Sequence, residues 1–301
     1  MYVITGATGN TGHEIVKRLL TKAEKVRAIG RNAGRLQPLA ANGAEPFVCE
    51  LTDSDNLARA FVGAEAAYVM IPPDPSSRDY RSYQERLSSS LATALEKAGV
   101  KYAVALSSYG ADKPDKTGPV VGVHNLEEKL NRIPNLNVLY LRAGYFMENT
   151  FAQLDIIKAM GTCAGPLRAD LKLPMIATRD IGSAAADALF RRDFRGHQTR
   201  ELLGQRDLSM AEAAKIIGKA IHQPGLGYVQ LPDEKVRPAL IQGGMSEGMA
   251  DAILEMAAAL NSGYMRALEP RSPQNTTPTS YETFVAEEFA RRYSQDKSSA
   301  A

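Results

Sequence analysis

Short apolar runs rich in β-branched residues alternate with longer amphipathic stretches over the first 142 residues of the chain. Buried parallel strands appear as short apolar runs, and the helices between them show one apolar face, so this alternation predicts a doubly wound α/β fold. The expected strands are residues 1–5, 25–30, 45–49, 65–71, 101–107 and 135–142. A first helix is expected over residues 12–23, whose apolar side chains repeat on one face.

After Arg142 the pattern loosens into a helix-rich region with a few short strands, for example 200–203 and 227–231. This region predicts a smaller, helix-rich C-terminal substrate domain. Residues 180–190 form a strong helix candidate whose alanines would allow close packing, so the chain is expected to return to the first domain there.

We therefore expect a parallel, Rossmann-type domain over residues 1–150, rejoined by about 176–192. The smaller substrate or partner domain would comprise 151–175 and 193–295. Residues 296–301 have the polar composition of a disordered tail.

Composition narrows the class of protein. A chain of 301 residues with 44% hydrophobic residues can bury a substantial core. The 36 basic and 34 acidic residues almost cancel, which argues against nucleic acid or an anionic membrane as a partner. The two cysteines and four scattered histidines predict neither a disulfide framework nor a metal site. No apolar run approaches the roughly 18 residues needed to span a bilayer, and a cytoplasmic location is expected.

The sharpest local signal is a glycine-rich turn between the first expected strand and the first expected helix. Glycine lets the backbone turn tightly and approach a pyrophosphate, whose charge is stabilised by the free N–H groups at the start of the following helix. The residues expected to bind a dinucleotide here are Gly6, Thr8, Gly9, Asn10, Thr11 and Gly12. The alternative is a tight turn that binds nothing.

The end of the second expected strand indicates which dinucleotide is bound. NAD enzymes usually place an acidic residue there, on the adenosine ribose. This chain instead has Arg31, followed by Asn32, with Arg35 one helical turn later. A guanidinium pairs with a 2′-phosphate, and such a bond contributes roughly 1.5–3 kcal/mol, so the sequence favours NADPH over NADH. The alternative is that Arg31 is a solvated surface charge.

Further cofactor contacts are expected where other strands end, because open parallel sheets bind ligands at the carboxyl ends of their strands. The residues that this rule selects after the third, fourth and fifth strands are Glu50, Leu51, Ile71, Pro72, Ser107 and Ser108.

The tyrosine and lysine pair of ordinary short-chain dehydrogenases has no convincing match. In that pair the phenol transfers a proton and the ammonium, four residues later, lowers the pKa of the phenol. Two pairs have the spacing by coincidence, Tyr109/Lys113 in a loop and Tyr293/Lys297 in the terminal tail. The helix expected over 122–132 carries His124 and Glu128 at the corresponding positions.

Five segments, which together span most of the chain, carry a resemblance to a known family: Gly6 to Gly12, Gly30-Arg31-Asn32, His124 to Lys129, Leu141 to Asn149 and Thr277-Pro278-Thr279. With them the chain resembles the NmrA-like family of atypical short-chain dehydrogenases, and within it the bacterial NADPH-dependent quinone reductases. The resemblance implies a cleft between two domains, with nicotinamide near His124 and the segment 145–149. Glu50 departs from the quinone reductases, where an aspartate is more usual.

We favour NADPH-dependent hydride transfer to a quinone or a similar planar, conjugated acceptor. The anion formed from such an acceptor is delocalised, so a strong protein acid is less necessary than in ketone reduction. His124, with an unperturbed pKa near ~6.5, would donate a proton or a hydrogen bond to the acceptor. Tyr145 would form part of an apolar substrate wall. The alternatives are that His124 is a polar residue lining the cleft and that Tyr145 belongs to the core.

The second hypothesis is a non-catalytic NADP(H)-sensing regulator, because the resemblance includes members that bind the dinucleotide without turning it over. A regulator needs a protein partner, and the methionine-rich stretch 239–265 offers an adaptable surface, unless it belongs to the core or to a pocket wall. A nucleotide-sugar epimerase or an ordinary carbonyl reductase is disfavoured by the missing tyrosine and lysine. The identity of the acceptor and the oligomeric state stay open.

Overall fold

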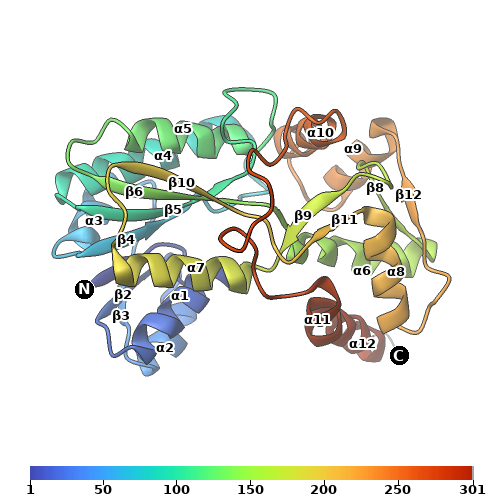
Figure 1. The fold of residues 1–301 in the computed structure, drawn as a ribbon, viewed down its shortest axis with the longest axis horizontal. Helices are drawn as coiled ribbons and strands as arrows, with labels where there is room; N and C mark the ends of the chain where they lie inside the picture. The colour runs from blue at the N-terminus through green and yellow to red at the C-terminus, as the bar shows by residue number, and fades with distance from the viewer. Residues whose placement is uncertain (300–301) are drawn as a thin grey trace.

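The computed structural model describes residues 1–299 and is built around a parallel sheet of seven strands, in the order β10-β6-β5-β4-β1-β2-β3 (Figure 1). The strands of this sheet are β1 (Tyr2–Ile4), β2 (Val26–Gly30), β3 (Glu45–Val48), β4 (Ala66–Val69), β5 (Tyr102–Ser108), β6 (Asn137–Ala143) and β10 (His197–Leu202). All six strands expected from the sequence are present, which confirms the doubly wound α/β fold.

Helices cover both faces of the sheet (Figure 1). One face carries α1 (Asn10–Thr21), α2 (Ala33–Ala41) and α7 (Thr178–Arg191), and the other carries α3 (Ser54–Phe61), α4 (Tyr80–Lys97) and α5 (Val120–Leu130). Successive strand residues point to opposite faces: Tyr2 and Ile4 join the core beneath α1 and α7, and Val3 joins the core beneath α3 and α4. Apart from the exposed edge strand β3, the apolar runs of the sequence therefore correspond to strands buried on two sides.

A second lobe packs around a separate hydrophobic core at the other end of the molecule (Figure 1). Its strands are β7 (Tyr145–Phe146), β8 (Cys163–Gly165), β9 (Leu173–Ile176), β11 (Asp207–Leu208) and β12 (Tyr228–Gln230). Its helices are η1 (Met147–Ala152), α6 (Gln153–Met160), α8 (Met210–Ala220), α9 (Asp233–Gln242), α10 (Glu247–Asn261), α11 (Tyr281–Phe284), η2 (Val285–Phe289) and α12 (Ala290–Ser299).

The strand expected near residues 200–203 belongs to the large sheet and not to the second lobe. It is β10, which pairs in parallel with β6 from His197 to Leu202 and forms the edge of the sheet. The first three residues of β10 are exposed and only its last two are buried, so the strand lacks the apolar run that marks a central strand. This weak pattern explains why the sequence suggested the wrong lobe for it.

Helix α7 lies against α1 on one face of the sheet (Figure 1). The contact is close because Gly182 has no side chain: a Cβ placed there would lie 2.8 Å from Glu14 Cβ and 2.9 Å from the carbonyl oxygen of Thr11. The N-terminus of α7 is thereby brought beside the N-terminus of α1.

Two expectations near the C-terminus are refined. The methionine-rich stretch is divided between α9 and α10 by Gly243 and Gly244, and its Met249 and Met265 are buried in hydrophobic cores. Helix α12 continues to Ser299, so residues 296–299 of the expected tail are helical, and the last two residues of that tail lie outside the described part of the chain.

Replacing Gly182 by alanine tests the contact between α1 and α7. The new Cβ meets backbone and Cβ atoms that cannot move aside easily, so we expect Gly182→Ala to lower the free energy of unfolding by about 1–3 kcal/mol in urea denaturation. The neighbouring variant Ser183→Ala, at a partly exposed position of α7, serves as the control and should change stability by less than about 0.5 kcal/mol. Equal stability of the two variants would show that the contact is not tight.

Candidate functional site

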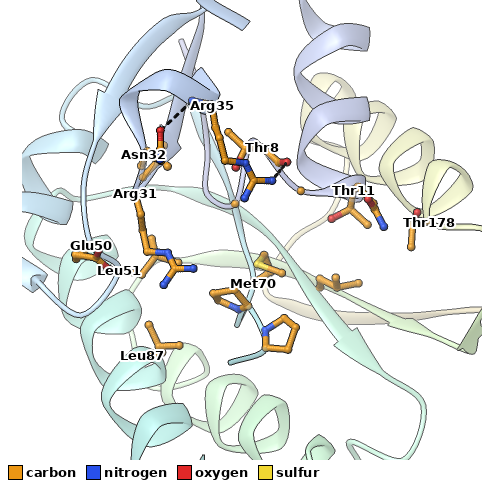
Figure 2. Close-up of a pocket in the computed structure, with 18 of the residues that line it drawn as sticks. Thr8, Thr11, Arg31, Asn32, Arg35, Glu50, Leu51, Met70, Leu87 and Thr178 are labelled. Atoms are coloured by element: carbon orange, nitrogen blue, oxygen red, sulfur yellow. Dashed lines mark hydrogen bonds between the residues drawn. The ribbon is translucent and has the colours of Figure 1, made fainter. Parts of the chain in front are cut away.

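A cleft of about 770 Å³ runs along the carboxyl ends of the parallel strands (Figure 2). This volume lies within the usual range of small-molecule sites. The lining residues come from the loops after the strands, from α4 and from the N-termini of η1 and α7: Gly6, Thr8, Gly9, Asn10, Thr11, Ile29, Gly30, Arg31, Asn32, Arg35, Cys49, Glu50, Leu51, Thr52, Met70, Pro72, Pro73, Tyr83, Leu87, Leu106, Phe146, Glu148, Asn149 and Thr178.

The glycine-rich turn forms the middle of the cleft. Gly6 has a φ of +59°, and a Cβ on Gly12 would lie only 2.3 Å from the carbonyl oxygen of Gly6, so glycine is required at both positions. Helix α1 begins at Asn10 with no side chain capping its N-terminus. The first N–H groups of a helix have no intrahelical partner, and here they lie at the cleft, where an anionic group is stabilised.

Two arginines lie at the end of the cleft formed by β2 and β3. The Nη2 atom of Arg35 donates a hydrogen bond to the carbonyl oxygen of Thr8 at 3.1 Å, and Asn32 caps α2 by accepting from the Arg35 N–H (Figure 2). Arg31 is exposed and, within residues 1–299, forms no hydrogen bond or ion pair. Figure 2 shows its side chain extending into the cleft on the side of Leu51.

A carboxyl group lies at the opposite end of the cleft. Glu148 Oε1 accepts hydrogen bonds from the N–H of Thr178 at 2.9 Å and from its hydroxyl at 2.5 Å, and so caps α7. Glu148 Oε2 is shielded from solvent and has no partner among the described residues. Burial raises the pKa of Glu148 above its ordinary value, although both hydrogen bonds from Thr178 oppose this shift.

Most of the residues expected to bind the cofactor line the cleft. These are Gly6, Thr8, Gly9, Asn10, Thr11, Arg31, Glu50, Leu51 and Pro72. Gly12 lies directly behind the turn, in contact with Gly6. Ile71 packs against the core beneath α3 and α4, and its neighbour Met70 takes the position at the cleft.

The structure does not bring Ser107 and Ser108 to the cleft. The hydroxyl of Ser107 donates to Glu127 Oε1 at 2.5 Å, and Glu127 also accepts two hydrogen bonds from Arg142, at 3.0 and 2.6 Å. Ser108 donates to the carbonyl oxygen of Tyr109. Ser107 is therefore held by the ion pair between Glu127 of α5 and Arg142 of β6, and Ser108 is held by the backbone.

His124 and Tyr145 also lie outside the cleft lining. The Nδ1 atom of His124 lies 2.8 Å from the carbonyl oxygen of Ala111, which can only accept, so we assign a proton to Nδ1. Tyr145 packs against the core of the second lobe, and burial raises its pKa to about 12. The neighbouring Phe146 lines the cleft instead.

Other lining residues were expected only from the resemblance, or not at all. Glu148 and Asn149 belong to the segment 145–149, which the resemblance implies is near the nicotinamide; the rule for strand ends does not select them, because β7 lies between them and β6. Tyr83 and Leu87 come from one face of α4, and Thr178 comes from the start of α7. No local pattern marks these three, because their place at the cleft results from long-range packing of helices.

The described part of the chain shows neither a metal site nor a membrane-spanning helix. Among residues 1–299, no group of three or more histidine, cysteine, aspartate or glutamate side chains is arranged to hold a metal ion. In the same range, no helix is long and apolar enough to cross a membrane.

The ion pair behind β5 should be structural. Replacing Glu127 by alanine leaves the partly buried charge of Arg142 without its ion-pair partner, so we expect a loss of about 3 kcal/mol in the free energy of unfolding, measured by urea denaturation. The adjacent Glu128 is exposed, and Glu128→Ala should change stability by less than about 0.5 kcal/mol. A small effect of Glu127→Ala would show that the pair contributes little to folding.

Comparisons with known proteins add a family context. A model of the NmrA-like family matches residues 2–290. Among curated relatives, the NAD(P)H azoreductase of Xenophilus azovorans is 28% identical over 280 residues, which cover 92% of this chain and 93% of that protein.

Two solved structures share the fold. An NADPH-dependent quinone oxidoreductase from Escherichia coli, complexed with NADPH, superimposes with a TM-score of 0.74 at 23% identity, covering 96% of this chain and 100% of the other. Nmra, a negative transcriptional regulator in complex with NAD, superimposes with a TM-score of 0.68 at 17% identity, covering 98% and 97%. The fold is thus shared by an enzyme and by a regulator.

Proposed function

Because the chain belongs to the NmrA-like family, we propose that it is an oxidoreductase that binds NADPH and reduces a quinone or a similar conjugated acceptor. The observation that carries this proposal is the cleft, which has an uncapped helix N-terminus at its middle and, at one end, Arg31, which has no ion-pair partner within residues 1–299. The relatives named as an azoreductase and a quinone oxidoreductase support the same reaction class.

The residues of the cleft fit a dinucleotide. Gly6 and Gly12 leave room for the backbone to approach a pyrophosphate, and the N–H groups at the start of α1 would hold its charge. The adenosine half would lie toward β2 and β3, with Arg31 on the 2′-phosphate and Arg35 beside it. The other half would then extend toward η1 and α7, where Phe146 and Glu148 lie.

The far end of the cleft suits a flat, apolar acceptor. A bound nicotinamide would supply hydride there. Met70, Leu106 and Phe146 contribute apolar lining that excludes water, which favours hydride transfer over side reactions. His124 as a hydrogen-bond or proton donor, and Tyr145 as part of the substrate wall, stay predictions.

A regulator that senses NADP(H) is the second candidate. Its support is the shared fold with a negative transcriptional regulator and the absence of a tyrosine–lysine pair on α5, where His124 and Glu128 stand. Turnover separates the two functions, because a sensor binds the cofactor without consuming it.

Oxidation of NADPH by the purified protein, followed by absorbance with a panel of quinones and azo dyes, tests the proposal. We expect acceptor-dependent turnover above the background of a no-protein control. The variant Gly12→Ala, whose Cβ would collide with Gly6, should lose this turnover together with cofactor binding. Tight binding of NADPH without turnover on any acceptor would contradict the reductase and support the sensor.

Changing Arg31 to alanine tests the choice of cofactor. Loss of one charge-assisted hydrogen bond costs roughly 1.5–3 kcal/mol, so we expect Arg31→Ala to weaken NADPH binding about 10- to 100-fold in calorimetry, with NADH binding nearly unchanged. Arg132→Ala removes the same charge from an exposed position after α5 and should leave both affinities unaltered. An unchanged ratio of the two affinities in Arg31→Ala would refute the assignment.

A further inference from the structure

We infer that Glu148 delivers the proton that the reduced acceptor needs, an inference that rests on the reductase function proposed above. Hydride transfer to a quinone or an azo group leaves an anion, which must be protonated to complete the reduction. The sequence suggested His124 for this step, but the structure places a different titratable group at the end of the cleft.

The order of the strands places Glu148 at the end of the cleft where the nicotinamide of a bound cofactor would lie. Along the sheet, the loops after β3, β2, β1, β4 and β5 follow one another, and η1 comes after β6. Arg31 follows β2 near one end of this series, and Glu148 lies in η1 at the other. A dinucleotide with its 2′-phosphate on Arg31 and its pyrophosphate on the glycine turn therefore extends its nicotinamide toward Glu148.

The hydrogen bonds of Glu148 leave one oxygen for the proton. Oε1 accepts from both the N–H and the hydroxyl of Thr178, so its lone pairs are used. Oε2 has no partner among the described residues and is shielded from solvent. A buried carboxyl oxygen without a donor is costly when charged, and a proton on Oε2 removes that cost. The protonated form then offers an O–H group to a ligand.

The charged groups around Glu148 do not neutralise it. Glu288, on η2, repels its carboxylate and adds to the effect of burial in raising its pKa. On α7, Arg179 is paired with Glu287, and Asp180 accepts hydrogen bonds from the backbone and hydroxyl of the distant Thr279. Arg191, at the far end of α7, is paired with Asp193, so among the described residues no arginine of α7 is left unpaired to hold Glu148 ionised.

The other candidate donors are engaged elsewhere. The Nδ1 proton of His124 is donated to the Ala111 carbonyl oxygen, and the His124 ring does not line the cleft. Ser107 is held by Glu127. Among the residues that line the cleft between Leu106 and Thr178, Glu148 is the titratable one.

The proton balance of the step is simple. The O–H bond at Glu148 Oε2 breaks, and the proton bonds to the oxygen or nitrogen of the anion formed when the acceptor takes hydride. The carboxylate that remains is held by the two hydrogen bonds from Thr178 until it regains a proton from solvent. NADPH is the reductant and the quinone or azo compound is the oxidant.

The variant Glu148→Gln keeps the size of the side chain and an oxygen for Thr178 but has no transferable proton. A general acid must be protonated, so wild-type kcat should be constant at low pH and fall as the pH rises through the pKa of Glu148. This fall at high pH is the descending limb of the pH profile. In Glu148→Gln we expect kcat to be about 100-fold lower and the descending limb to be absent. The NADPH dissociation constant and the melting temperature should stay close to wild type, as in the control Glu96→Gln, at an exposed position of α4.

The variant Thr178→Val tests the direction in which the pKa of Glu148 changes, which a purely structural role of Glu148 would not affect. The hydroxyl of Thr178 stabilises the carboxylate and lowers the pKa of Glu148, so its removal should raise that pKa. The descending limb of kcat should then move to higher pH, and the infrared band of the protonated carboxyl should persist to the same higher pH. That band should be absent from Glu148→Gln, with or without cofactor.

Three results would overturn the inference. In an active wild type, an unchanged pH profile of Glu148→Gln would remove Glu148 from the proton step and leave the reductase function intact. If Thr178→Val lowered kcat equally at every pH, with no shift of the descending limb or of the infrared band, the role of Glu148 would be structural only. Absence of turnover in the wild type would refute the reductase function itself, and the proton step with it.

Discussion

The close approach of α1 and α7 is the constraint on which the site depends. Gly12 lets α1 start directly against the turn at Gly6, and Gly182 lets α7 lie against the first turns of α1. Two helix N-termini thus open toward one cleft. The two N-termini differ in what binds their free N–H groups: α1 has no side-chain cap, whereas α7 is capped by Glu148. One is free for an external anion, and the other already holds a carboxylate of the protein.

This arrangement gives the cleft different chemistry along its length. Exposed guanidinium groups lie at the end near β2, backbone N–H groups lie in the middle, and apolar side chains with one buried carboxyl lie near η1. On the sheet side of α5, Glu127 forms an ion pair with Arg142 of β6 and accepts a hydrogen bond from Ser107. Glu148 lines the cleft from η1, and it is the proton donor that we infer.

Sequence patterns predicted six of the seven strands of the large sheet, the glycine turn and Arg31, because each depends on local periodicity or on residues adjacent in the chain. They misplaced β10, since an exposed edge strand carries little apolar signal. They did not predict Thr178 at the cleft or the bond between Ser107 and Glu127. Both follow from helices that return from distant parts of the chain, and side-chain pairing across such distances leaves no mark in local sequence.

The central claim is that this cleft binds one dinucleotide and recognises its 2′-phosphate. Calorimetric titration of the wild-type protein with NADPH and with NADH, at the same ionic strength, measures this directly. The account predicts one site per chain and an affinity for NADPH at least about tenfold higher, as one charge-assisted hydrogen bond to Arg31 implies. Equal affinities, or no binding of either dinucleotide, would contradict it.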